Sequence, residues 1–159
     1  MISSYITKLH RNEFERKEKM DKKQVLIQKA ADIIQKQCGV DGYCALTLMD
    51  LDNRPITTTI TPSKADGISW ITFCTGFGTR TQRIEFSPNA CVCFNSPTYH
   101  ISLKGTMEVI TDDEVKKEMW YDGLQNHFSG PTDPGYVVLK FTADSYTLFI
   151  DWQEERGTI

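Results

Sequence analysis

A long alternation of apolar and polar side chains, Tyr99–Ile110, constrains the fold of this chain more than any other feature. The apolar positions within it are Ile101, Leu103, Met107 and Val109. A period of two residues is typical of a β-strand that buries one face. The length of the strand and the glycine at Gly105 indicate that it bends and serves two parts of a small barrel.

Other strands and helices are predicted at short intervals around this one. Strands are expected over Tyr43–Asp50, Pro55–Thr61, Ile68–Thr75, Ala90–Asn95, Tyr136–Thr142 and Tyr146–Trp152. Helices are expected from a capping box at Asp21–Gln24 to a stop at Gly39, over Thr79–Phe86, and from Thr111–Glu114 to about Tyr121. Loops are expected at Lys64–Gly67, after Pro62 ends the second strand, and at Asp144-Ser145 between the last two strands.

These connections are too short for β-α-β units, so the fold class is mainly β (α+β), with a small antiparallel barrel and about three peripheral helices. Residues 21–159 form this single domain. Residues 1–20 are polar and mixed in charge, and we interpret them as a flexible or loosely helical arm. A solvated tail is the favoured interpretation of the arm, and an arm that embraces a second copy is the alternative.

Composition and motifs narrow the classes of function. The net charge of −3 argues against a nucleic-acid partner, and no apolar run suits a membrane span or a secretory signal. Five cysteines without framework spacing are typical of free thiols in a cytoplasmic protein. Cys91 and Cys93 share one face of a strand, but no second ligand pair accompanies them, so no metal site is predicted.

The strongest site signal is the turn Thr75–Arg83, where a strand ends, Gly76 and Gly78 allow a tight turn, and a helix begins. Free backbone N–H groups at a helix start, together with the helix dipole, suit a phosphate. Threonine hydroxyls and the charges of Arg80 and Arg83 support this interpretation. The alternative is a helix capped by Thr79 with solvated arginines.

Two weaker signals accompany the turn. The run Thr57-Thr58-Thr59 suits an edge strand, and beside a phosphate site it could also line a flat polar ligand. An aromatic group of Trp120, Tyr121, His127 and Phe128 is more often core packing, and the functional alternative is a wall over a planar ring.

Four stretches together resemble the pyridoxamine 5′-phosphate oxidase-like family of FMN-binding split β-barrels, and more closely its general stress protein branch. They are Arg54–Thr59, then Phe73–Thr75 with Thr79–Thr81 and Ser87–Asn89, then Tyr99–Val109, and finally Glu118–Trp120 with His127-Phe128, Gly130 and Asp133-Pro134. The resemblance covers about Asp21 to Trp152.

This resemblance implies a homodimer with two FMN molecules at the interface and a small-molecule electron donor and acceptor. It implies that Arg80, Thr79 and Thr75 hold the FMN phosphate, that His100 lies near the cofactor, and that Trp120 and Phe128 approach the flavin ring from the partner. The full set of predicted cofactor-binding residues is Thr57, Thr58, Thr59, Ile60, Cys74, Thr75, Thr79, Arg80, Thr81, His100, Trp120 and Phe128.

The chain departs from the family pattern at the phosphate. The family's lysine after the arginine position is Thr81 here, so Arg80 carries most of the charge, with Arg83 and Lys64 as candidate substitutes. The basic substrate-binding residues near the C-terminus of the vitamin oxidases have no counterpart in Gln153–Ile159, which argues against pyridoxamine phosphate as the substrate.

The leading hypothesis is a flavin-dependent oxidoreductase of unknown substrate, in which the cofactor supplies the redox chemistry. A second hypothesis is a non-enzymatic flavin-binding stress or sensor protein. A third keeps the barrel but replaces FMN by a deazaflavin or haem, with His100 or His127 as the haem ligand. An interaction scaffold without a phosphate ligand is the remaining alternative.

Overall fold

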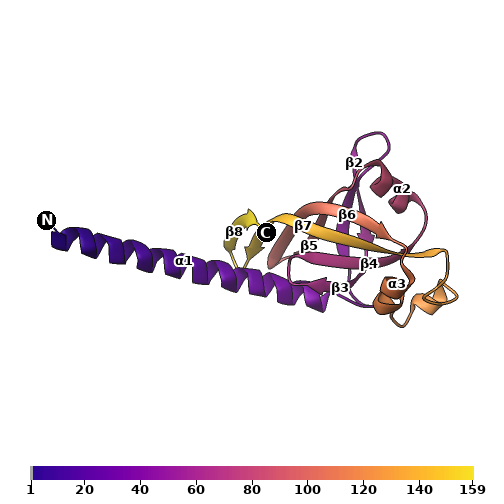
Figure 1. The fold of residues 1–159 in the computed structure, drawn as a ribbon, viewed down its shortest axis with the longest axis horizontal. Helices are drawn as coiled ribbons and strands as arrows, with labels where there is room; N and C mark the ends of the chain where they lie inside the picture. The colour runs from indigo at the N-terminus through magenta and orange to yellow at the C-terminus, as the bar shows by residue number, and fades with distance from the viewer. Residues whose placement is uncertain (1) are drawn as a thin grey trace.

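The computed structural model describes the backbone of residues 2–159 and the side-chain surroundings of residues 8–159. A long helix leads into a curled antiparallel sheet with two shorter helices at one end (Figure 1). The elements are α1 (Ile2–Lys36), β1 (Cys44–Met49), β2 (Pro55–Ile60), β3 (Pro62–Asp66), β4 (Trp70–Gly76), α2 (Thr79–Phe86), β5 (Asn89–Ser96), β6 (Tyr99–Ile110), α3 (Asp113–Met119), the 3-10 turn η1 (Leu124–Asn126), β7 (Tyr136–Ile150) and β8 (Gln153–Thr158).

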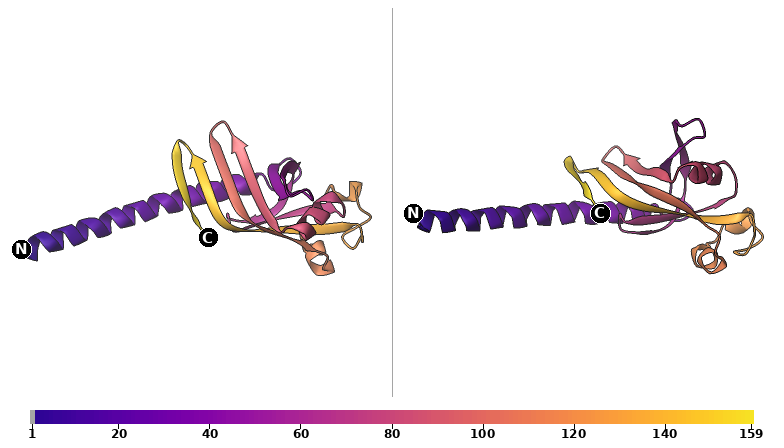
Figure 2. Two further views of the ribbon diagram at one scale, coloured as in Figure 1. Left: turned by 90° about the horizontal axis from the view of Figure 1, so that it is seen from above. Right: turned by 45° about the horizontal axis from the view of Figure 1, so that its top comes forward.

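The sheet has the order β2-β1-β5-β6-β7-β4-β3, and β8 adds to the free half of β7. All neighbours are antiparallel. The edge strands β2 and β3 follow one another through Thr61, so the two edges of the sheet meet at that residue. Figure 2 shows the strong curl of the sheet. The predicted small split β-barrel with three helices is therefore confirmed.

The bend predicted at Gly105 is present as a bulge between β6 and β7. Lys104 pairs with Ser145, whereas Gly105 pairs with Ala143, which leaves Asp144 without a partner in the ladder. A Cβ atom at Gly105 would lie 1.9 Å from the carbonyl oxygen of Thr142, so only glycine fits there. Asp144 therefore bulges and does not turn the chain, and the prediction of two separate strands at this position is wrong.

Three other sequence predictions were wrong at element boundaries. The loop expected at Lys64–Gly67 lies mostly within the edge strand β3 (Pro62–Asp66), which tolerates Pro62 at its first position. β8 was not predicted, because its turn at Asp151 and Trp152 uses positive φ angles of 51° and 64° without glycine. The N-cap of α3 is Asp112, which accepts from the N–H groups of Glu114 and Val115, and not Thr111 as the predicted capping box requires; the helix ends at Met119 rather than near Tyr121.

The first helix begins at Ile2, so the predicted start at Asp21 is wrong. No glycine or proline interrupts the chain from Ile2 to Lys36. Ion pairs one helical turn apart, Arg11–Glu15 at 3.0 Å and Glu18–Lys22 at 3.1 Å, support the polar part. Asp21 lies inside the helix and caps nothing. Helix boundaries do not test whether residues 1–20 are flexible.

The core fills the concave face of the sheet. Its largest fully buried side chains include Phe73, Phe94, Phe141, Leu46 and Leu103. Leu26, Ala30 and Ile34 of α1 and Ile84 of α2 join the same cluster. A second, smaller cluster of Met119, Leu124, Tyr136 and Val138 lies at α3 and η1. In the described part of the chain, no helix is long and apolar enough to span a membrane.

Substitution Gly105→Ala is expected to destabilise the fold by about 1–3 kcal/mol, because the methyl group collides with the β7 backbone. Urea unfolding measures this change. Gly130→Ala is the matched control, since a Cβ atom there meets no atom within 4 Å. Equal unfolding midpoints for the two variants would show that the bulge does not require glycine.

Candidate functional site

The turn between β4 and α2 is held closed by Thr81. Its Oγ1 accepts from the N–H of Gly78 at 3.1 Å and donates to the Gly78 carbonyl at 2.8 Å. Thr81 is only 3% exposed, so its hydroxyl is used inside the turn. A second anchor is the N–H of Phe77, which donates to the carbonyl of Gly135 at 3.1 Å. The helix predicted over Thr79–Phe86 is confirmed, but Gly78, and not Thr79, occupies the N-cap position.

Arg80 links this turn to the edge strand β2. Its Nη2 donates to the carbonyl of Thr59 at 3.0 Å and approaches Oγ1 of Thr58 at 3.5 Å. Its Nε is buried and has no hydrogen-bond partner among the described residues. Burial, and secondarily the charge of Arg83, lowers the pKa of Arg80. Because arginine stays protonated in proteins, this cost indicates a place where an anion would be stabilising.

The two other cations proposed for the phosphate are occupied elsewhere. Nε of Arg83 lies 3.0 Å from Oδ1 of Asp50, and the Arg83 side chain is only 12% exposed. The hydrogen bond from Arg83 lowers the pKa of Asp50. Lys64 Nζ donates to the carbonyl of Glu118 at 2.8 Å. Arg83 and Lys64 therefore stabilise the fold, and neither replaces the missing lysine.

A hollow of about 460 Å³ opens beside Arg80. It is lined by Thr59, Ile60, Thr61, Cys74, Thr75, Gly76, Arg80, Tyr121, Leu124, His127 and Phe128. These residues come from β2 and the residue after it, β4, α2 and the segment around η1. Thr59, Thr61, Thr75 and Arg80 make part of this lining polar, and Tyr121, His127 and Phe128 make another part aromatic. This arrangement can hold a ligand with an anionic group at one end and a planar apolar group at the other.

The aromatic wall is fixed by Tyr136. The ring centroid of Tyr136 lies 5.3 Å from that of Phe128 and 5.3 Å from that of Trp120. Phe128 lines the hollow, but Trp120 does not and packs edge-on against Tyr136. The thiol of Cys74 lies 3.3 Å from the Tyr136 hydroxyl and 3.4 Å from the carbonyl of Met119, and burial raises its pKa.

The loop after Phe128 is organised by Asp133. Its carboxylate accepts from the N–H of Ser129 at 2.8 Å, the hydroxyl of Ser129 at 3.0 Å and the N–H of Gly135 at 2.7 Å. Lys116, which is 3% exposed, donates from Nζ to the Asp133 carbonyl at 2.8 Å. The hydrogen bonds from Ser129 and Gly135 lower the pKa of Asp133.

The structure brings together about half of the residues that the sequence singled out. Those that line the hollow are Thr59, Ile60, Cys74, Thr75, Arg80 and Phe128. Thr79 is exposed at the start of α2, and Thr58 contacts Arg80. Whether these residues bind a cofactor stays a prediction.

Two predicted residues lie away from the hollow. His100 is exposed near the other end of β6, with Nδ1 3.8 Å from Sγ of Cys93. Oγ1 of Thr57 lies 2.8 Å from that of Thr47 on the neighbouring strand.

Conversely, the predicted set missed Thr61, Gly76, Tyr121, Leu124 and His127, which line the hollow. Tyr121 and His127 belong to the aromatic group noted in the sequence, but spacing alone does not separate them from Trp120.

Comparison of the chain with known proteins identifies its family. A family model described as pyridoxamine 5′-phosphate oxidase matches residues 26–149. No match to the chain was found among curated proteins.

Several solved structures share the fold. A protein related to general stress protein 26 from Clostridium acetobutylicum is 19% identical, with a TM-score of 0.73 over 84% of this chain and 94% of that chain. General stress protein 26 from Bacillus anthracis strain Sterne is 24% identical, with a TM-score of 0.69 over 83% and 98%. A heme binding protein from Mycobacterium smegmatis is 12% identical, with a TM-score of 0.63 over 81% and 57%.

Acid is expected to weaken the Asp133 loop. A carboxyl group with a lowered folded-state pKa stabilises the fold above its unfolded pKa, about 3.9, and this stabilisation disappears as the pH falls through the folded-state pKa. Asp133→Asn should therefore lower stability at pH 6 and flatten the loss of stability below pH ~4. Urea unfolding between pH 3 and 6 measures both effects.

The control for this experiment is Asp122→Asn, at an exposed aspartate in the segment between α3 and η1. An Asp133→Asn profile that follows the parent chain as closely as the control does would show that the carboxylate does not hold the loop.

Proposed function

The chain belongs to the pyridoxamine 5′-phosphate oxidase family, and on that premise we propose that it is an FMN-binding flavoprotein whose turn Thr75–Arg83 holds the cofactor phosphate. The observation that carries the proposal is the buried Nε of Arg80, which has no hydrogen-bond partner among the described residues. A phosphate oxygen at this position would satisfy that donor and offset the burial of the positive charge.

The residues around Arg80 fit the rest of a phosphate site. Thr75 lines the hollow and Thr79 is exposed at the first turn of α2, so both hydroxyls are available as donors beside the helix start. The carbonyl of Thr59 accepts from Nη2 of Arg80 and so holds the guanidinium beside the hollow that Arg80 lines. Thr81 supports the site indirectly, because it closes the turn.

The aromatic side of the hollow suits the flavin ring system. Phe128 and Tyr121 present apolar surface, and Tyr136 fixes Phe128 from behind. Bound FMN supplies hydride or single-electron transfer, and the chain supplies position, polarity and exclusion of water. On this basis we propose a flavin-dependent oxidoreductase with a small-molecule electron donor and acceptor.

We also propose that the working form is a homodimer. β2 is an edge strand whose Thr57 and Thr59 are exposed, and the hollow is open on one side of a single chain. A second copy would cover this side and complete the cofactor site. Trp120 packs against Tyr136 of its own chain and does not line the hollow there. The second copy would therefore supply further contacts to the flavin ring.

Two alternatives remain as outcomes of the same measurements. A non-enzymatic flavin binder would hold FMN that NAD(P)H cannot reduce. A haem protein would use His127, which lines the hollow, and would show a Soret band in place of the flavin absorbance. His100 is a weaker haem ligand candidate, because it lies away from the hollow.

Substitution Arg80→Ala tests the phosphate site. It removes the charge and the unpaired donor, and charge-assisted hydrogen bonds contribute about 1.5–3 kcal/mol, so FMN affinity should fall by about 10- to 150-fold. Quenching of flavin fluorescence on titration into protein stripped of flavin measures the dissociation constant. Gln82→Ala, at an exposed position of the same helix, is the matched control and should leave the affinity unchanged.

Arg80→Lys separates charge from geometry and should restore only part of the affinity, because lysine lacks the planar fork of donors. Equal affinity of the Arg80→Ala variant and the parent chain would overturn this placement of the phosphate. A stripped protein that binds no added FMN would overturn the flavin proposal itself.

A further inference from the structure

The N-terminal part of α1 extends beyond the barrel. Figures 1 and 2 show this helix projecting from the sheet, and every residue from Lys8 to Lys22 is exposed. Only its C-terminal part enters the core, through Leu26, Ala30 and Ile34. A polar helix without tertiary packing is stabilised only by its own propensity and by ion pairs such as Arg11–Glu15, so a partner along the projecting part would add to its stability.

A single stripe of residues runs from the packed part of α1 onto the projecting part. Its members follow alternating steps of four and three residues, and they are Leu9, Glu13, Arg16, Met20, Lys23, Ile27, Ala30 and Ile34. The sequence continues the same spacing upstream at Ile6 and Ile2. This is the repeat of two paired helices in a coiled coil. Leu9 and Met20 are 55% and 57% exposed, so no side chain among residues 8–159 covers the stripe at these positions.

Within its projecting part, from Leu9 to Met20, the stripe is complementary to itself in the antiparallel direction. Suppose that two copies of α1 run antiparallel and cross between Phe14 and Glu15. A residue that precedes the crossing point by some number of positions then meets the residue of the second copy that follows it by the same number. Leu9 then meets Met20 of the second copy, and Glu13 meets Arg16. Each of these contacts occurs twice, because a two-fold axis relates the copies. An apolar pair thus flanks an ion pair on both sides of the axis.

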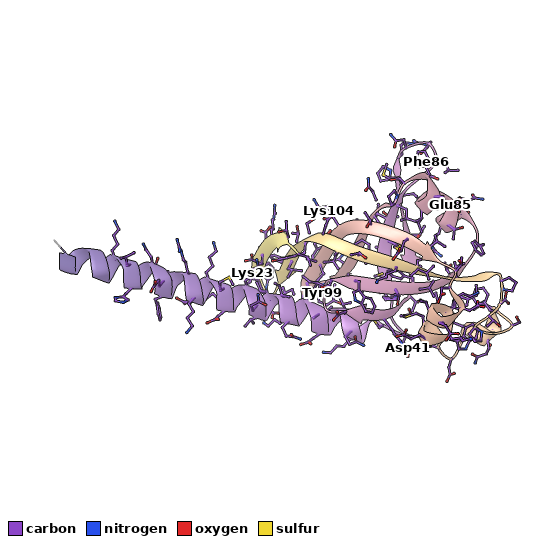
Figure 3. The ribbon with its side chains drawn as sticks, viewed as in Figure 1. Lys23, Asp41, Glu85, Phe86, Tyr99 and Lys104 are labelled. Atoms are coloured by element: carbon purple, nitrogen blue, oxygen red, sulfur yellow. The ribbon has the colours of Figure 1, made fainter. Side chains whose placement is uncertain are left out.

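The surface beside Met20 has room for a second helix. A hollow of about 450 Å³ is lined by Arg16, Lys19, Met20, Lys23 and Glu155, between α1 and β8. Figure 3 shows Lys23 where α1 passes β8. In the antiparallel arrangement, the residue delivered to this hollow is Leu9 of the second copy.

We propose that the projecting α1 helices of two copies of this chain pair antiparallel through Leu9, Glu13, Arg16 and Met20. This inference is independent of the proposed flavin site, since none of the four residues lines the hollow beside Arg80. The projecting segment has an excess of basic residues, which could also attract an acidic partner. The carboxylate of Glu13 and the apolar Leu9 and Met20 within the stripe favour a second copy, because each finds a matching residue there.

Cross-linking tests the register directly. In the double variant Leu9→Cys with Met20→Cys, mild oxidation should give a covalent dimer on non-reducing gels. The two positions lie about 17 Å apart along one helix at 1.5 Å per residue, so they cannot join within one chain. The control Arg11→Cys with Glu18→Cys uses two positions equally far from the crossing point but places both thiols on the opposite side of the helix.

The parent chain carries five cysteines, so it is oxidised in parallel. Cross-linking that is confined to the Leu9/Met20 variant supports the proposal. Equal cross-linking of both double variants, or no cross-linking of either, overturns it.

Charge reversal gives a second test that needs no cysteine. Glu13→Arg or Arg16→Glu alone should place like charges at both central contacts and raise the dissociation constant of self-association about tenfold. The combined variant, Glu13→Arg with Arg16→Glu, should restore it. Sedimentation velocity over a concentration series measures these constants, and circular dichroism verifies that each variant folds.

Self-association that is the same in the single and combined variants would overturn the helix pairing. Dependence on charge without rescue in the combined variant would also overturn it, and would indicate a different, acidic partner surface. The homodimer proposed for the cofactor site forms on the β2 side of the hollow and not through α1, so FMN affinity should be equal in all these variants. This separates the outcome from that of the Arg80 experiment.

Discussion

The pairing of β6 with β7 is the interaction on which the rest of the structure depends. The two strands stay paired from Tyr99 to Ile110, and the bulge opposite Gly105 turns both of them partway along. β4 then adds to one half of β7 and β8 to the other. Because the sheet bends at this point, its edges β2 and β3 come together at Thr61. The same bend directs the end of β4 toward the edge strand β2, which is the place where the candidate site forms.

Arg80 converts this fold into a site. It reaches from α2 to the β2 carbonyl of Thr59, so a helix and an edge strand whose contacting residues lie 21 positions apart in the chain share one guanidinium. That contact satisfies part of the guanidinium and leaves Nε buried without a hydrogen-bond partner among the described residues. The neighbouring cation, Arg83, is neutralised by Asp50 and adds to the cost of the Arg80 charge without binding a ligand. Of the three cations considered for the phosphate, Arg80 is the one that lines the hollow. A phosphate there would depend on hydrogen bonds from the turn as well as on the charge of Arg80.

Local patterns in the sequence predicted β6, α2 and the bend at Gly105, because each depends on residues within a few positions. The sequence did not reveal β8, whose polar strand depends on pairing with β7, nor that Asp144 bulges instead of turning, since that depends on the opposite strand. The same limit applies to the site. Arg83 and Lys64 are cations in the right region, but their partners lie 33 and 54 residues away, so only the folded chain shows that they are occupied.

The most direct test of the central claim is the affinity of the stripped protein for FMN compared with riboflavin, which differs only by the phosphate. Fluorescence quenching gives both dissociation constants under one set of conditions. If the turn at Arg80 holds the phosphate, FMN should bind at least about tenfold more tightly, and Arg80→Ala should abolish most of this preference. Equal affinity for the two flavins in the parent chain would contradict a phosphate site at the start of α2.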